Sequence, residues 1–209
     1  MMKASDICNG LDDCLVQARA LQKKKRFSEA IKEYKRGLGY DPNNVGAWEG
    51  IVSCNLELGN AKMALEALNT LVEITPHNQS FWTDKAYLHL LINENVQGIN
   101  TLREVLEHHP KRVLEWELLA IALIAEGEWE EAVHALERAL VLNPNSAVAW
   151  YNLAVCHLAF DDYVSAVEAA DYAVALDPSL MVLADEWLEM ARAEGIYEDY
   201  PSNDGIAAS

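Results

Sequence analysis

The chain has 209 residues, of which 16 are Lys or Arg and 33 are Asp or Glu, so its formal net charge is −17. Apolar residues make up 51% and only six residues are Pro, which excludes collagen-like and intrinsically disordered chains. The longest apolar run, residues 118–125, is far shorter than the ~20 residues that cross a bilayer, and surplus acid argues against nucleic acid as the main ligand.

Pro and Trp recur along the chain with one common period of 34 residues. The two series are Pro42, Pro76, Pro110, Pro144 and Pro178, and Trp48, Trp82, Trp116 and Trp150. Two series that keep the same step and register indicate an internal repeat. With place 1 of each repeat set at Leu11, Val45, Gln79, Val113 and Ala147, five repeats cover 11–44, 45–78, 79–112, 113–146 and 147–180.

Each repeat is predicted to form two antiparallel helices, helix A over places 1–14 and helix B over places 17–30. Places 8 and 20 hold mostly Ala, and places 24 and 27 are mostly apolar. Small side chains let two helix backbones approach closely, and larger ones fill the remaining space. Gly59 and Gly127 fall in the turn between A and B, where glycine adopts positive φ readily. Each periodic Pro ends a helix B.

Polar residues at predicted helix starts are candidate N-caps, because their side chains accept hydrogen bonds from free backbone N–H groups. Asn60 and Asp162 are expected to cap B helices. Asn78 and Ser146 are expected to cap A helices.

This pattern resembles the tetratricopeptide repeat (TPR) family, which has Trp at place 4, small residues at places 8, 20 and 27, a large one at 24 and Pro at 32. The resemblance covers about four-fifths of the chain. It implies an all-α fold, an α–α superhelix or solenoid of five helix-turn-helix repeats. Cys14 replaces Trp in the first repeat. The third repeat departs most, because Asn93, Asn95, Gly98 and Asn100 form helix poorly, so we expect any hinge there.

The ends of the chain lie outside the repeats. Residues 1–10 form an N-terminal extension. Residues 181–194 continue in helical period with Trp187 at place 7, and the resemblance implies a capping helix that covers the apolar end of the last repeat. Residues 195–209 show no helical pattern and are expected to form a flexible acidic tail.

No motif for catalysis, a metal or a cofactor is present. Glu131 and His134 form a single Glu-x-x-His pattern, whereas a carboxylate-bridged di-iron site requires two. His89 and His157, both at place 11, are expected to pack at the seam between helices A and B. We therefore predict a protein that is not an enzyme and has no cofactor.

In TPR proteins the A helices line a concave groove, so the resemblance directs places 2, 5, 6, 9, 12 and 13 into it. These places are largely polar in the first two repeats, where they hold Asp12, Arg19, Gln22, Lys23, Glu49, Ser53 and Glu57. In repeats 3 to 5 they are mostly apolar, and the candidate peptide-binding residues are Asp84, Tyr87, Leu90, Leu91, Leu114, Glu117, Leu118, Ile121, Ile124, Tyr151, Asn152, Val155 and Leu158. The alternative explanation is that these residues pack between adjacent A helices or are covered by the C-terminal cap and tail. Since a monomer rarely leaves a large apolar patch bare, the expected partner is an apolar peptide or helix with basic residues.

One known ligand of the family is not expected to bind. TPR domains that clamp EEVD-type chaperone tails use Lys at place 5 and Asn at place 9, then Asn at place 6, and Lys and Arg at places 2 and 6. Here no repeat has Lys at place 5 or Asn at place 9, and only Asn152 matches place 6. The carboxylate clamp is therefore absent from the sequence pattern.

Charge is distributed unevenly along the chain. Residues 1–36 contain nine Lys or Arg and five Asp or Glu, whereas residues 37–209 contain seven and 28. The run Lys23, Lys24, Lys25 and Arg26 is explained by a solvated helix end, where cations also suit the helix dipole. The alternative is a patch for an acidic partner, such as another copy of the chain.

Together these features predict a non-catalytic scaffold that binds a peptide or amphipathic helix in the groove. The alternative is a structural, self-assembling module that uses the same groove or its charged ends as a homo-oligomer interface. Four Cys without a CxxC pair and an N-terminus without an apolar signal region favour the cytoplasm. Neither a nucleic acid nor a membrane is expected as a partner.

Overall fold

The computed structural model describes residues 10–184 and residue 187. These residues form α-helices and a short 3-10 helix, and no strand occurs among them. Within the same residues, no helix has both the length and the apolar character needed to cross a membrane. The chain divides into two compact units, Met1–His108 and His109–Ser209. Each unit is described by itself below.

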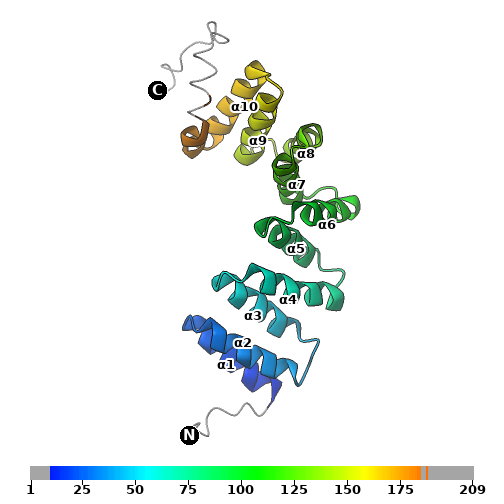
Figure 1. Ribbon diagram of the computed structural model, residues 1–209, viewed down its shortest axis with the longest axis vertical. Helices are drawn as coiled ribbons and strands as arrows, with labels where there is room; N and C mark the ends of the chain where they lie inside the picture. Colours follow the sequence, from blue (N-terminus) through cyan, green and yellow to red (C-terminus); the bar gives the residue numbers. More distant parts are fainter. Residues whose placement is uncertain (1–9, 185–186, 188–209) are drawn as a thin grey trace. The chain divides into compact units, whose positions relative to one another are not determined.

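The first unit is a stack of helix pairs (Figure 1). Its described helices are α1 (Leu11–Lys23), α2 (Phe27–Leu38), α3 (Val45–Glu57), α4 (Ala61–Ile74), α5 (Gln79–Leu91) and α6 (Asn95–His108). The two helices of each repeat pack against each other. In addition, α2 packs against α3 and α4 packs against α5, so each repeat is joined to the next.

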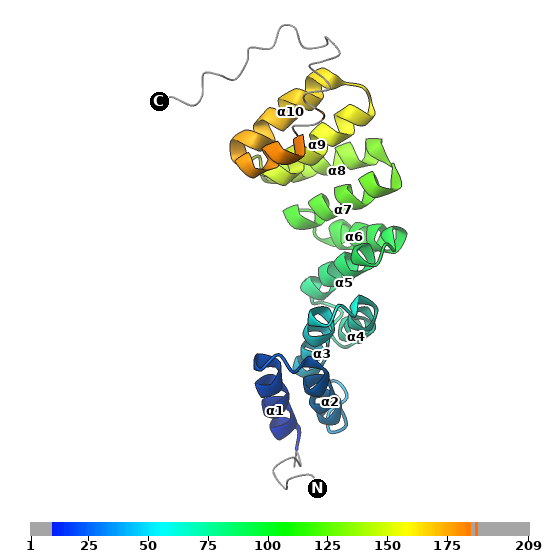
Figure 2. The same ribbon diagram turned by 60° about the vertical axis from the view of Figure 1, so that its left-hand side comes forward.

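The second unit contains the fourth and fifth repeats (Figure 2). Its described elements are α7 (Val113–Glu126), α8 (Trp129–Leu142), α9 (Ala147–Ala159), α10 (Tyr163–Leu176) and the 3-10 helix η2 (Pro178–Leu180). Helix α9 packs against α10, α8 and α7, and η2 packs against α10. The predicted all-α fold of five helix pairs is confirmed, with helix bounds close to places 1–14 and 17–30.

The ends of the chain are described only in part. Residues 181–184 and Trp187 are helical, and Trp187 packs against the cluster of Ala154, Ala169 and Ala170. The rest of the predicted capping helix, at 185–186 and 188–194, lies outside the described residues. Residues 1–9 of the extension and the tail at 195–209 also lie outside them.

The Ala residues at places 8 and 20 lie at the centre of each helix pair. All of them are fully buried: Ala18, Ala30, Ala64, Ala86, Ala120, Ala132, Ala154 and Ala166. The large residues at place 24 are buried as well, namely Tyr34, Leu68, Leu102 and Leu136. The repeat pattern in the sequence is thus the pattern of the core, in which close backbone contact at two places leaves space for one large side chain nearby.

Tyr34 of α2 joins the first repeat to the second by lying against Gly50 of α3. A Cβ atom at Gly50 would meet the Tyr34 ring at 2.2–2.6 Å, so no larger residue fits while the ring keeps this position. The Tyr34 hydroxyl donates a hydrogen bond to Oε1 of Gln22 at 2.9 Å. Nε2 of Gln22 in turn donates to Oγ of Ser53 at 2.9 Å. The contact between the two repeats is therefore both apolar and polar.

The periodic Trp and Pro residues form one interaction. The indole Nε1 of each Trp donates a hydrogen bond of 2.8–2.9 Å to the carbonyl oxygen of the Pro six residues before it, in the pairs Trp48–Pro42, Trp82–Pro76, Trp116–Pro110 and Trp150–Pro144. The indoles are only part-buried. They tie the start of each A helix to the loop that precedes it, and this explains why both series share one period.

Three of the four predicted N-caps are confirmed. The side chains of Asn78, Ser146 and Asp162 each accept a hydrogen bond from a backbone N–H in the first turn of their helix. The prediction for Asn60 is wrong, because its side chain makes no capping bond. The chain enters α4 at Asn60 with ψ 60°, well short of the extended ψ of 105° at Asn44. Asn44, which was not predicted, caps α3.

The turn between helices A and B has a left-handed residue at place 15 in all five repeats. These residues are Lys25, Gly59, Asn93, Gly127 and Asp161, with φ between 57° and 78°. In each turn the N–H of place 15 bonds to the carbonyl of place 12, and the N–H of place 16 bonds to the carbonyl of place 11. Asn and Asp tolerate this conformation, whereas for other non-glycine residues, here Lys25, it costs about 1–2 kcal/mol. Helix packing on both sides therefore imposes the turn even where glycine is missing.

Lys25→Gly is expected to raise the free energy of unfolding by about 1 kcal/mol, because glycine relieves the left-handed strain. Lys24→Gly is the matched control: it removes the same charge at φ −84°, where glycine only adds conformational entropy to the unfolded chain. The control should lower stability by about 0.5–1 kcal/mol. Urea unfolding followed by circular dichroism measures both variants, and equal effects of the two substitutions would contradict this account of the turn.

Candidate functional site

The surface formed by places 2, 5, 6, 9, 12 and 13 of the A helices, called here the A-helix face, carries the predicted binding residues. Four of the thirteen lie on α5 in the first unit, and nine lie on α7 and α9 in the second. None of the thirteen is fully buried. The exposed ones are Asp84, Tyr87, Leu91, Leu114 and Ile121, and the other eight are part-buried. Packing between helices therefore leaves every predicted residue at least partly accessible.

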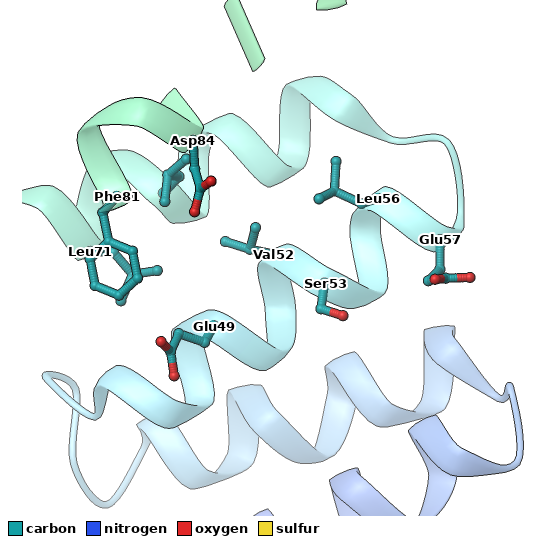
Figure 3. Close-up of a pocket in the computed structure, with 9 residues that line it drawn as sticks. Glu49, Val52, Ser53, Leu56, Glu57, Leu71, Phe81 and Asp84 are labelled. Atoms are coloured by element: carbon teal, nitrogen blue, oxygen red, sulfur yellow. The ribbon is translucent and has the colours of Figure 1, made fainter. Parts of the chain in front are cut away.

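In the first unit the A-helix face is hollowed between α3 and α5 (Figure 3). The lining residues come from α3, α4 and α5: Glu49, Val52, Ser53, Leu56, Glu57, Leu68, Leu71, Phe81 and Asp84. Val52 and Leu56 point from α3 toward the side on which Asp84 of α5 lies. Glu57 is the last residue of α3, and Glu49 lies about one turn after its start. The hollow thus combines an apolar interior with carboxylates around it.

The apolar wall of the hollow is part of the protein core. Leu68, Leu71 and Phe81 are at most 6% exposed and belong to one buried cluster, against which Val52 packs. Because interiors are close-packed and resist rearrangement, this wall has a fixed shape before any ligand arrives.

Asp84 is the carboxylate of the hollow that protein atoms desolvate most clearly. It retains access to solvent, yet protein atoms displace much of its water, and this desolvation raises the pKa of Asp84 above its ordinary value. Among the described residues, no ion pair or hydrogen bond engages the carboxylate of Glu49, Glu57 or Asp84. Within the described part of the chain, these three carboxylates therefore have no direct ionic or hydrogen-bonding partner.

The hollow overlaps with the predicted binding residues only at Asp84. Sequence reasoning placed the groove in repeats 3 to 5 because their A-helix places are apolar, and it treated Glu49, Ser53 and Glu57 only as polar positions of the second repeat. The sequence did carry a signal for the hollow. Asp84 and the three polar residues of the second repeat occupy places 5, 6, 9 and 13, which the family pattern directs to one face. The depth between neighbouring helices, however, arises from Leu68, Leu71 and Phe81, which do not belong to those places.

In the second unit the A-helix face is mostly apolar. Leu114 and Ile121 of α7 are 54% and 40% exposed, and Val148 of α9 is 46% exposed. Val148 occupies place 2 of the fifth repeat and was not among the predicted residues. Leu118 and Val155 are part-buried on the same face. These side chains form an accessible apolar surface along α7 and α9.

The polar residues predicted on this face are held by contacts within the protein. Oγ of Ser146 donates a hydrogen bond to Glu117 at 2.5 Å. Nδ2 of Asn152 donates to the carbonyl of Val148 at 2.9 Å, and the Tyr151 hydroxyl donates to the carbonyl of Leu183 at 3.4 Å. The polar groups thus already have partners, and the apolar side chains are the groups on this surface that a ligand would remove from water.

The basic run Lys23, Lys24, Lys25 and Arg26 lies at the first turn and is exposed throughout. Nε of Arg26 donates a hydrogen bond to Oε1 of Glu29 at 2.6 Å, so this guanidinium already has an acidic partner. Lys25 occupies the left-handed position of the turn. The role of these four residues as a patch for an acidic partner stays a prediction.

The histidines singled out in the sequence have structural contacts. Nδ1 of His89 lies 2.8 Å from Glu94, and Nδ1 of His157 lies 3.5 Å from Asp162, so each pairs with a carboxylate across its turn. His134 packs edge-on against Trp116. Among the described residues, no three His, Cys, Asp or Glu side chains come together in a way that could hold a metal ion.

Three cysteines, Cys14, Cys54 and Cys156, are buried and unpaired. Burial raises the pKa of the Cys156 thiol to about 11 and also raises the pKa of Cys54. Thiols in such surroundings stay protonated near neutral pH and react poorly. They act as small apolar side chains of the core.

Two models of the tetratricopeptide repeat match the chain, one at residues 21–83 and the other at residues 117–180. The matches together span more than half of the chain and lie in different units. The protein belongs to the tetratricopeptide repeat family. Members of this family are in general protein-interaction modules.

Solved structures of other TPR proteins share the fold. A crystal structure of MamA has 20% sequence identity and a TM-score of 0.70, with coverage of 78% of this chain and 95% of that chain. MamA residues 41 to the end from Desulfovibrio magneticus RS-1 have 17% identity and a TM-score of 0.73, with coverage of 82% and 97%. YrrB, described as a TPR protein with an unusual peptide-binding site, has 18% identity and a TM-score of 0.69, with coverage of 83% and 91%. At these identities the likeness shows the fold alone. No curated protein matches the chain by sequence.

Asp84→Asn is expected to make the protein more stable at about pH 7, because it removes a charge from a desolvated position. The pKa of this carboxyl is higher in the folded protein than in the unfolded chain. As the pH falls through the folded-state pKa, the folded protein binds the proton first, and the cost of the desolvated charge is removed. The stability difference between variant and wild type should therefore shrink as the pH falls from about 7 toward about 4. Urea unfolding at several pH values measures this difference. The control is Glu66→Gln on the exposed face of α4; a wild type that is more stable than Asp84→Asn at neutral pH would contradict the account.

Proposed function

We propose that the protein is a non-catalytic scaffold whose A-helix faces bind segments of partner proteins. Membership of the TPR family supports a role in protein interaction. The observation that carries the proposal is the exposed apolar surface of α7 and α9, with Leu114, Ile121 and Val148. Covering apolar surface gains about 25 cal/mol for each Å² removed from water, so these side chains favour a ligand that buries them.

The proposed ligand is a peptide or amphipathic helix that is apolar and carries basic residues. Apolar side chains of such a ligand would cover Leu114 and Ile121, and its charge would complement a chain with a net charge of −17. The fold accommodates a peptide in at least one structural neighbour, since YrrB is described as having an unusual peptide-binding site. An acidic EEVD-type tail is the wrong charge for carboxylates such as Glu49 and Asp84.

We further propose that the protein works in the cytoplasm. Cys14, Cys54 and Cys156 are all unpaired, which fits a reducing compartment. The same acidic charge makes a nucleic acid an unsuitable ligand.

Substitution of both Leu114 and Ile121 by Glu is expected to abolish most peptide binding. The full chain is used to select from a phage library of random dodecapeptides, and the most enriched peptide is synthesised with a fluorophore. Its affinity, measured by fluorescence anisotropy, should fall roughly tenfold or more, because the variant places charges where apolar contacts were made. Leu118 and Leu158 are less suitable positions because they are part-buried.

Val141→Glu is the matched control, since Val141 of α8 is 74% exposed and lies on a B helix. It should change the affinity less than about twofold. Failure of the wild type to enrich any peptide, or equal losses in both variants, would contradict the proposal. Light scattering tests the self-assembling alternative: a dimer that Leu114→Glu with Ile121→Glu converts to a monomer would replace peptide binding by self-association.

A further inference from the structure

We propose that the hollow between α3 and α5 is a subsite for one Lys or Arg side chain of a bound peptide. The inference rests on the proposed function and extends it to the first unit, where it names the residue class that the ligand must contain. Three features support it: the apolar wall, the carboxylates without an ion-pair partner, and the spacing of these carboxylates.

The wall suits the aliphatic part of a long basic side chain. Val52 and Leu56 line the hollow from α3, and Leu56 is 41% exposed. Lys and Arg carry three or four methylene groups, which cover apolar surface while the charged head stays in a polar environment. A short polar side chain would leave this wall in contact with water.

The carboxylates suit the charged head of the same side chain. Asp84 lies across the hollow from Val52 (Figure 3), and within the described residues it has no cationic partner. Because water is already partly displaced from Asp84, a cation there is attracted more strongly than at an open surface. A hydrogen bond between a guanidinium and a carboxylate is among the strong ones in proteins.

The spacing of the carboxylates disfavours a small metal ion as the occupant. Glu49 and Glu57 lie eight residues apart on α3, which corresponds to about 12 Å along the helix. They therefore surround the hollow with negative potential but do not converge on one point. An elongated, flexible cation fits this arrangement, and the ends of α3 would attract further basic residues of the same peptide.

The experiment uses the full chain and the peptide library described above. Peptides enriched by the wild type should contain Lys or Arg, and the most enriched Arg-containing peptide is synthesised together with an analogue in which citrulline replaces that Arg. Citrulline keeps the length and shape of the side chain but has no charge. For the wild type, fluorescence anisotropy should show roughly tenfold weaker binding of the citrulline peptide.

In Asp84→Asn the two peptides should bind within about twofold of each other, because the partner of the charge is gone. Glu66→Gln makes the same charge change on the outer side of α4 and should retain the tenfold preference of the wild type. Thermal unfolding checks that both variants are folded, and Asp84→Asn is expected to be at least as stable as the wild type.

The possible results separate the two proposals. A wild type that enriches no peptide contradicts the proposed function. Enriched peptides without Lys or Arg, or a preference for Arg over citrulline that Asp84→Asn leaves intact, overturn the subsite alone. Self-association at low salt that Asp84→Asn abolishes, without any effect on peptide binding, would assign the hollow to the basic run of a second copy and would also overturn the subsite.

Discussion

The close approach of two helix backbones within each repeat is the constraint on which the rest of the structure depends. Fully buried Ala at places 8 and 20, replaced only by Val52 in the second repeat and Gly98 in the third, brings helix A against helix B. In the first four repeats a large residue at place 24 then fills the space beside them. Since these inward places make the core, the A-helix face is not needed for pairing within a repeat. The side chains on this face can therefore differ in polarity and charge from one repeat to the next.

The A-helix faces of the two units differ in charge and polarity. In the first, Glu49, Glu57 and Asp84 surround a hollow whose wall is core. In the second, Leu114, Ile121 and Val148 leave an apolar surface open to solvent. The hollow of the first unit suits basic residues and the surface of the second suits apolar ones, and the net charge of the chain also favours basic ligands.

The fold could be predicted from the sequence because the core places recur with a fixed period. The helix bounds, the buried places 8, 20 and 24, and most of the N-caps follow from that period. Asn60 makes no capping bond although Asp162 caps α10 from a similar backbone conformation, so a polar residue at a helix start does not by itself establish a cap. The left-handed conformation of Lys25, Asn93 and Asp161 was missed, although these residues share place 15 with Gly59 and Gly127. Asn and Asp adopt this conformation more readily than other non-glycine residues, so Lys25 is the one position without a signal in its residue type.

The candidate site could be predicted only in part. The candidate list contained every apolar residue described on the second-unit surface except Val148. Val148 occupies place 2, as Leu114 does, so the family pattern covered it although the list omitted it. The hollow escaped prediction because its depth comes from Leu71 and Phe81, two core residues of different helices. Residue type and spacing do not predict this hollow, because it forms only where neighbouring helices leave space between them.

The most direct test of the central claim is a crystal structure of the full chain with an enriched Arg-containing peptide. The peptide is expected on the A-helix face, with its guanidinium within hydrogen-bond distance of the Asp84 carboxylate and its methylene groups against Val52. A peptide bound along the B helices, or one whose Arg side chain extends into solvent away from α3 and α5, would contradict it.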